Sequence, residues 1–141
     1  MNNILSKYQT SGHFFFNIED ELKKVCNAPE DKSGVYIIYS VVKDKEDIIY
    51  IGASGKMKQD GKISHRKGGL KDRLVNGHQF GQKRYKSWKV QMKNDKISVI
   101  KIGWWVTYSE SIKHIPKYTE AVLLQEYFEK HNKLPKWNKI Y

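Results

Sequence analysis

Two β-prone runs stand close together in the chain, GVYIIYSVV at residues 34–42 and IIYIGA at residues 48–53. Both runs are rich in β-branched and aromatic residues, which favour extended backbone. We therefore expect one strand from Val35 to Val42 and a second from Ile48 to Ala53, joined by a charged turn over Lys43 to Asp47. Strands this close in sequence pair most simply as an antiparallel hairpin.

The segments around this hairpin predict helices and one further strand. Asn17 to Asn27 has the pattern of a short helix, and Leu70 to about His78 that of a second. A long β-prone run predicts the third strand over Ile97 to Tyr108. Pro116 marks the start of a last helix, which runs from about Tyr118 to His131. The expected fold class is α+β, a small three-stranded antiparallel sheet flanked by helices.

Length and charge restrict the class of protein. The 141 residues fit a single domain over 1–141, in which residues 1–30 form an N-terminal helical extension. Lys and Arg number 26 against 15 Asp and Glu, so the net charge is +11. A domain this basic attracts polyanions, and we expect a nucleic acid rather than a membrane surface as its partner.

Cysteine content and hydropathy exclude other classes. The single cysteine, Cys26, cannot form an intrachain disulfide or a cysteine-based zinc site. The sequence has no apolar run of about 18 residues and no apolar segment of secretory type near Met1. We therefore expect a cytoplasmic protein that does not span a membrane.

Two tyrosines occupy comparable places in the expected hairpin. Alternate residues of a strand share a face, so Tyr36 is expected on the side of Ile38, and Tyr50 on the side of Ile48. With simple pairing, both hydroxyls reach the same surface. On composition alone, they would be cross-strand aromatic residues that stabilise a sheet.

The spacing of these residues adds a functional interpretation. Gly34-Val35-Tyr36 and Tyr50-Ile51-Gly52, one hairpin apart, resemble the signature of the GIY-YIG nuclease superfamily. The superfamily also has an arginine between leucines, as in Leu70-Lys71-Asp72-Arg73-Leu74, and a glutamate on a late helix, here Glu120. An asparagine near a proline follows, as in Pro135-Lys136-Trp137-Asn138. The five elements stand in family order over residues 34–138.

The resemblance implies a metal-dependent endonuclease that hydrolyses DNA phosphodiester bonds. Glu120 would hold a single Mg²⁺ or Mn²⁺ ion, and Arg73 would neutralise charge on the phosphoryl oxygens. Tyr36 would help to take the proton from the attacking water, and Tyr50 would orient Tyr36 and the phosphate. Asn138 would support the site by hydrogen bonding.

A histidine near the arginine is a further candidate. Some members of the superfamily place a histidine after the arginine, as a general base or a phosphate contact. His78 stands in this position. The alternative is a histidine that complements the negative end of the preceding helix dipole.

Two choices among similar residues stay open in the sequence. The spacing to Asn138 favours Glu126 as the metal ligand, whereas helical periodicity places Glu120 on the packed face of its helix. The stretch from Tyr50 to Arg73 is long and looks more like that of the small restriction endonucleases in the superfamily. Those enzymes can place a loop lysine near the scissile phosphate. Three residues of this loop are candidates: Lys56, Lys58 and Lys62.

A second class of function fits the same composition. Between Arg66 and Lys89, basic residues alternate with Phe80, Tyr85 and Trp88, a pattern that suits a phosphate backbone with stacked bases. The alternative to an endonuclease is therefore a non-catalytic basic nucleic-acid-binding module on the same fold.

Overall fold

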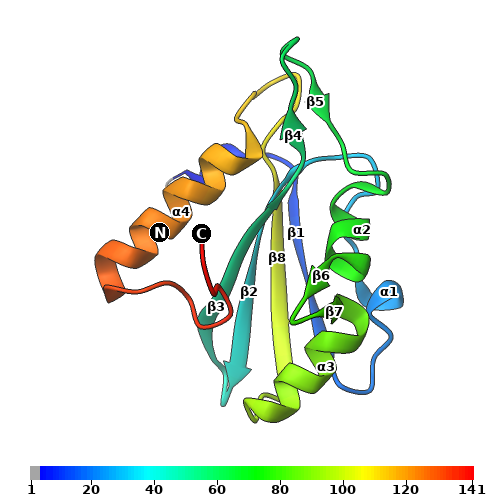
Figure 1. The fold of residues 1–141 in the computed structure, drawn as a ribbon, viewed down its shortest axis with the longest axis vertical. Coiled ribbons are helices and arrows are strands. Elements are labelled where there is room, and N and C mark those ends of the chain that lie inside the picture. The colour runs from blue at the N-terminus through cyan, green and yellow to red at the C-terminus, as the bar shows by residue number, and fades with distance from the viewer. Residues whose placement is uncertain (1–3) are drawn as a thin grey trace.

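The computed structural model describes residues 4–141 and has an α+β architecture, as expected (Figure 1). Within these residues, four strands form an antiparallel sheet in the order β1-β8-β2-β3. Their bounds are Ser11–Asn17 for β1, Gly34–Val42 for β2, Lys45–Ser54 for β3 and Val99–Val106 for β8. The expectation of three strands is wrong, because β1 adds a fourth beside β8.

Helices cover both faces of the sheet. Helices α2 (Gly69–Asn76) and α3 (Arg84–Asn94) lie on one side, and α4 (Pro116–His131) lies on the other (Figure 1). The short helices η1 and α1 span Leu5–Lys7 and Leu22–Val25. None of the helices in residues 4–141 has the length and apolarity needed to cross a membrane.

Two small ribbons complete the described part of the chain. Strands β4 (Lys56–Met57) and β5 (Ile63–Ser64) form a hairpin inside the stretch that follows β3. Strands β6 (His78–Gln79) and β7 (Gln82–Lys83) form another between α2 and α3.

The N-terminal segment differs from the sequence expectation. Where a helical extension was expected over residues 1–30, Ser11–Asn17 forms strand β1, paired along its length with β8. The helix expected over Asn17 to Asn27 is reduced to Leu22–Val25. Phe14 and Phe16 are buried and Phe15 is exposed, which is strand alternation hidden by three identical residues in a row.

The β2–β3 hairpin closes more tightly than its charged turn suggested. Lys43 and Asp44 both have positive φ, 51° and 63°, and Val42 pairs with Lys45. Two residues with positive φ form the tight turn whose twist matches a hairpin. The strands extend to this turn, so β3 begins three residues before the expected Ile48.

A β-bulge changes which residues share a face. Ile38 pairs with Tyr50, but the next residue, Tyr39, pairs with Ile48, so Ile49 is the extra residue. Ile48 therefore packs on the opposite side of the sheet from Tyr50, contrary to expectation. Tyr36 and Tyr50 do share one face, that of α2 and α3.

The sheet separates two hydrophobic cores. The larger one fills the space under α2 and α3 and contains the fully buried Leu70, Leu74, Trp88 and Met92. The other contains Val35, Ile37 and Ile51 of the sheet with Leu123 and Leu124 of α4. Trp104 and Trp105, adjacent in β8, belong to different cores, as strand geometry predicts.

Candidate functional site

Tyr36 lies on the central strand β2 and is fully buried. Its register partner across the hairpin is Gly52. A Cβ atom at Gly52 would lie 2.6 Å from both Cζ and the hydroxyl oxygen of Tyr36, and 2.7 Å from Cε2 of Tyr50. The glycine of the second tripeptide therefore provides the space in which the first tyrosine lies.

Tyr50 stacks against Tyr36, with 6.0 Å between ring centroids and 23° between ring planes. Burial first, and then the neighbouring Tyr36, raise the pKa of Tyr50 to about 12, although the cations Arg84 and Arg73 oppose the rise. Tyr50 is thus protonated near neutral pH and can donate a hydrogen bond.

A buried arginine that the sequence reasoning did not identify lies against the two rings. The guanidinium carbon of Arg84 is 5.1 Å from the Tyr36 ring centroid and 5.5 Å from that of Tyr50, within cation–π range. Nε of Arg84 donates to Oε1 of Gln79 at 3.1 Å, and Nη1 donates to the carbonyl of Arg73 at 3.0 Å. Arg84 is fully buried and places a fixed positive charge beside the tyrosine pair.

Helix α2 carries Arg73 to the tyrosines. The helix starts at two glycines in the left-handed region, and a Cβ at Gly69 would collide with the backbone of Glu30. Its first free N–H groups donate to the carbonyls of Lys32 and Pro29, at 3.1 Å each. These bonds fix the start of the helix one turn before Arg73.

Arg73 interacts electrostatically with three groups of the predicted site. The Tyr36 hydroxyl raises the pKa of Arg73 most, burial opposes the rise, and Tyr50 and Glu120 add to it. Arg73 therefore keeps its positive charge at neutral pH.

Glu120 lies in the first turns of α4 and is only 8% exposed. Burial raises the pKa of its carboxyl group; Lys117, a hydrogen bond from Tyr141 and Arg73 act in the opposite direction. Glu120 thus lies on the buried side of its helix, as helical periodicity predicted. Ala121, Phe128 and His131 of the same helix are exposed.

Three polar atoms of this group are buried without a hydrogen-bond partner among residues 4–141. They are the Tyr36 hydroxyl oxygen, Nε of Arg73 and Oε1 of Glu120. A buried polar atom left unsatisfied costs about 1–3 kcal/mol. Their gathering at one place is typical of a site that a ligand completes.

Asn138 supports the strand that carries Tyr50. Its Oδ1 accepts a hydrogen bond from the Ile51 N–H, and its Nδ2 donates to the Ile51 carbonyl, each at 3.0 Å. The neighbouring Trp137 N–H donates to the carbonyl of the bulged Ile49 at 2.8 Å. Asn138 contacts the backbone beneath the site rather than the other site side chains.

A basic cavity of about 520 Å³ adjoins Arg73. We use this name for the cleft at the end of β3, between α2, the β4–β5 hairpin and the start of α4. Strand β3 contributes Ala53 and Ser54 to its wall, and the basic lining residues come from the other three elements and the two residues that follow β5: Lys56, His65, Arg66, Arg73 and Lys117. Of the three loop lysines considered, Lys56 lines this cavity, whereas Lys58 and Lys62 do not.

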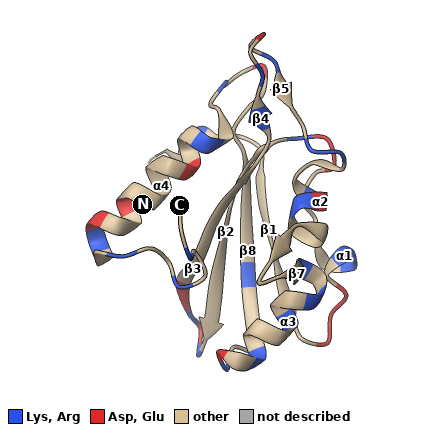
Figure 2. Ribbon diagram, viewed as in Figure 1, with Lys and Arg blue, Asp and Glu red and all other residues tan. Residues whose placement is uncertain are grey.

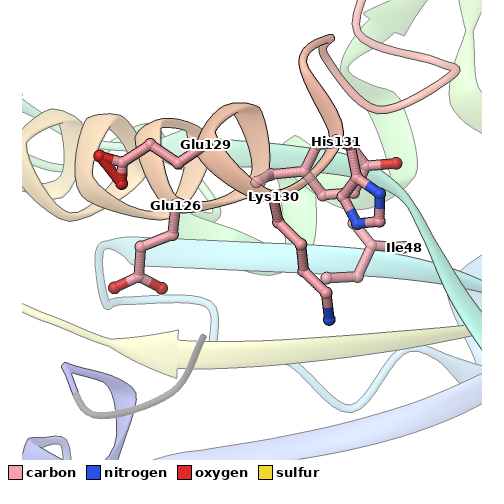
Figure 3. A pocket seen from close by; sticks show the side chains of 6 residues that line it. Ile48, Glu126, Glu129, Lys130 and His131 are labelled. Carbon is pink, nitrogen blue, oxygen red and sulfur yellow. The ribbon is translucent and has the colours of Figure 1, made fainter.

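Glu126, the alternative metal ligand, lies further along α4. It lines a separate pocket with Ile48, Lys130 and His131, near the C-terminal end of the helix (Figure 3). Figure 3 shows its carboxylate on the same side of α4 as the Lys130 ammonium group. The structure therefore brings Glu120, rather than Glu126, to Arg73 and Tyr50.

His78 does not join the group. It is exposed in β6 and pairs there with Lys83. Among residues 4–141, no hydrogen bond, ion pair or ring contact connects it to Tyr36, Arg73 or Glu120.

Comparisons with protein-family models, with curated proteins and with solved structures gave no match for this chain.

Proposed function

We propose that this protein is a metal-dependent endonuclease of the GIY-YIG type, a phosphodiester hydrolase that acts on DNA. The observation that carries the proposal is the convergence of Tyr36, Tyr50, Arg73 and Glu120 beside the basic cavity, with three buried polar atoms unsatisfied. Strands β2, β3 and β8 would correspond to the three-stranded sheet of the family, and β1 would be an addition at its edge.

The residues present fit a single Mg²⁺ or Mn²⁺ ion held by Glu120. Oε1 of Glu120 is a buried carboxylate oxygen without a hydrogen-bond partner in residues 4–141. Within the same residues, no three His, Cys, Asp or Glu side chains gather as a complete metal site. Magnesium commonly binds through one or two carboxylates and completes its shell with water and substrate phosphate oxygens. When bound, the ion would withdraw charge from a phosphate oxygen.

The chain's own residues divide the remaining chemistry. Arg73, permanently charged, would hold the phosphate and stabilise the negative charge that develops on its oxygens. Tyr36 would take the proton from the attacking water, and the protonated Tyr50 would orient Tyr36 by donating a hydrogen bond. Asn138 would keep the backbone of Ile51, and with it Tyr50, in position.

The distribution of charge supports DNA as the substrate. Figure 2 shows Lys and Arg along α2 and α3, on the β4–β5 hairpin and at the start of α4. Of these elements, α2, the β4–β5 hairpin and the start of α4 border the basic cavity. A phosphate backbone that crossed this face would meet cations on both sides of Arg73.

The test is incubation of purified protein with supercoiled plasmid, in Mg²⁺ and in EDTA. We expect nicked and linear DNA with Mg²⁺ and intact plasmid with EDTA. A protein that binds DNA with steep salt dependence but never cuts, on duplex, branched or single-stranded substrates, would instead be the non-catalytic binding module.

A further inference from the structure

His65 lies in the wall of the basic cavity, just after β5, and is exposed there. Its Nδ1 is 2.6 Å from the hydroxyl oxygen of Ser33. A hydrogen bond at one ring nitrogen fixes the orientation of the ring. Because Ser33 engages Nδ1, Nε2 is the nitrogen that is available to a ligand in the cavity.

Ser33 is a firm anchor for this ring. It is fully buried, and its carbonyl accepts a hydrogen bond from the Thr107 N–H at 3.3 Å. Gly55, which also lines the cavity, has φ +108° and packs so closely that a Cβ there would collide with the Ser33 side chain. The histidine is therefore held by a residue that is itself fixed from two sides.

The cavity holds few groups that can exchange a proton. Its other polar lining side chains, all within the described residues, are serine, lysine and arginine. Histidine is the side chain that most often acts as a general acid or base, so His65 is the member of this wall suited to proton transfer.

Arg73 connects the histidine with the tyrosines. Arg73 interacts with Tyr36, and it also lines the cavity together with His65. A phosphate paired with Arg73 would therefore adjoin both a tyrosine hydroxyl and an imidazole. Phosphodiester hydrolysis needs two proton transfers, one from the attacking water and one to the leaving oxygen.

We propose that His65 contacts the phosphate group in the basic cavity and donates the Nε2 proton of its protonated form to the leaving oxygen. The inference rests on the proposed endonuclease function. The water oxygen forms a bond to phosphorus, and the bond between phosphorus and the leaving oxygen breaks. The water proton goes to Tyr36, the leaving oxygen takes the proton of His65, and solvent restores both groups.

The first test compares histidine variants in single-turnover cleavage of a labelled duplex with Mg²⁺. We expect His65→Ala to lower the rate about 10²–10⁴-fold, the usual contribution of general acid–base catalysis. Affinity for the same duplex in EDTA should barely change. His13→Ala, which removes an exposed histidine on β1, is the matched control and should cut normally. Normal cleavage by His65→Ala would overturn the proposal.

The second test replaces the leaving oxygen by sulfur at the mapped cut. Sulfur leaves without protonation, so this substrate should restore the rate of His65→Ala and leave the defect of Tyr36→Phe in place. If His65→Ala is equally slow on the oxygen and the sulfur substrates, His65 is not the proton donor.

The third test separates this inference from the function on which it rests. Imidazole NMR signals of the wild-type protein are followed as a short DNA duplex is added in EDTA. The His65 signal should move, and the His13 signal should not. An unmoved His65 signal in a protein that cuts DNA would overturn this inference alone, whereas a protein that moves the signal but never cuts would overturn the endonuclease function and the proton transfer with it.

Discussion

The side-chain amide of Asn138 reproduces a strand pairing at the edge of β3. It accepts from the N–H of Ile51 and donates to the carbonyl of Ile51, both at 3.0 Å. Ile51 stands between Tyr50, which stacks on Tyr36, and Gly52, which lies under the Tyr36 ring. An asparagine 87 residues away therefore fixes the segment on which both tyrosines depend.

Asn138→Asp should break half of this pairing. An ionised aspartate can accept from the Ile51 N–H but cannot donate to the Ile51 carbonyl. We expect a loss of about 1–3 kcal/mol in the free energy of unfolding, because a part-buried acceptor is left unsatisfied. Urea unfolding measures this. Asn94→Asp, the same change at an exposed helix end, should cost at most about 1 kcal/mol through the helix dipole. Equal losses in the free energy of unfolding for the two variants would contradict the structural role of Asn138.

Gly52→Ala should disturb the tyrosine pair directly. Its methyl group would lie 2.6 Å from the Tyr36 ring, so the ring or the strand has to move, at a cost of about 1–3 kcal/mol. The rate of DNA cleavage should also fall, because the tyrosine pair is displaced. Gly61→Ala, where nothing lies within 4 Å of the new Cβ, should show only the cost of its positive φ and cut normally. Thermal unfolding and plasmid nicking of both variants test this, and a fully active Gly52→Ala protein would contradict it.

Local sequence patterns predicted the hairpin, β8, α2 and α4 well, because each has strong periodicity or clear start and stop residues. They failed for β1, where Phe14, Phe15 and Phe16 conceal the alternation of buried and exposed residues. They also missed α3, whose many charged residues read as a basic stretch although Trp88 and Met92 are fully buried.

The candidate site was predictable only where its residues stand in sequence motifs. Tyr36, Tyr50, Arg73 and Glu120 follow a spacing, and the structure brings them together. The places of Arg84 and His65 in the site depend on tertiary contacts. Arg84 lies against the Tyr36 ring, and His65 forms a hydrogen bond with Ser33. The buried position of Arg84 had no signal in the sequence, since an arginine among lysines ordinarily reads as surface.

Tyr36→Phe separates an enzyme from a binding module. The buried hydroxyl interacts with Arg73, and the ring stays to fill its space, so its removal should lower the free energy of unfolding by at most about 1–3 kcal/mol. Single-turnover cleavage should fall about 10²–10⁴-fold if the hydroxyl takes a proton from water. Tyr50→Phe should lose less, since Tyr50 orients but does not exchange a proton near neutrality. Full activity of Tyr36→Phe would refute the assignment of the base.

Lys56→Ala and Lys58→Ala form a matched pair for DNA binding. Both lysines are exposed in the same hairpin, but only Lys56 lines the basic cavity. Lys56→Ala should make the slope of log affinity against log salt shallower by about 0.9, the effect of one lost phosphate contact. Lys58→Ala should leave the slope unchanged. Identical salt slopes for the two variants would show that the DNA does not contact Lys56 in the basic cavity.

Glu120→Gln should show that this carboxylate destabilises the fold. Burial raises the pKa of Glu120, so the folded state holds the proton more tightly than the unfolded state. The wild type therefore loses stability as the pH rises from the ordinary carboxyl pKa to the raised one. The Glu120→Gln variant lacks this loss, so it should be at least as stable as the wild type at neutral pH. Asp72 and Asp95, whose pKa values are lowered, change stability in the opposite direction but do so in both proteins. Urea unfolding across this pH range gives the difference.

Cleavage by the same variant is the most direct test of the whole account. A labelled duplex is incubated in single turnover with Mg²⁺ and wild type, Glu120→Gln or Glu126→Gln, beside a binding titration in EDTA. We predict that Glu120→Gln binds the duplex normally but does not cut it, whereas Glu126→Gln cuts at nearly the wild-type rate. A Glu120→Gln protein that cuts normally while Glu126→Gln does not would contradict the assignment of the metal ligand and the site built around it.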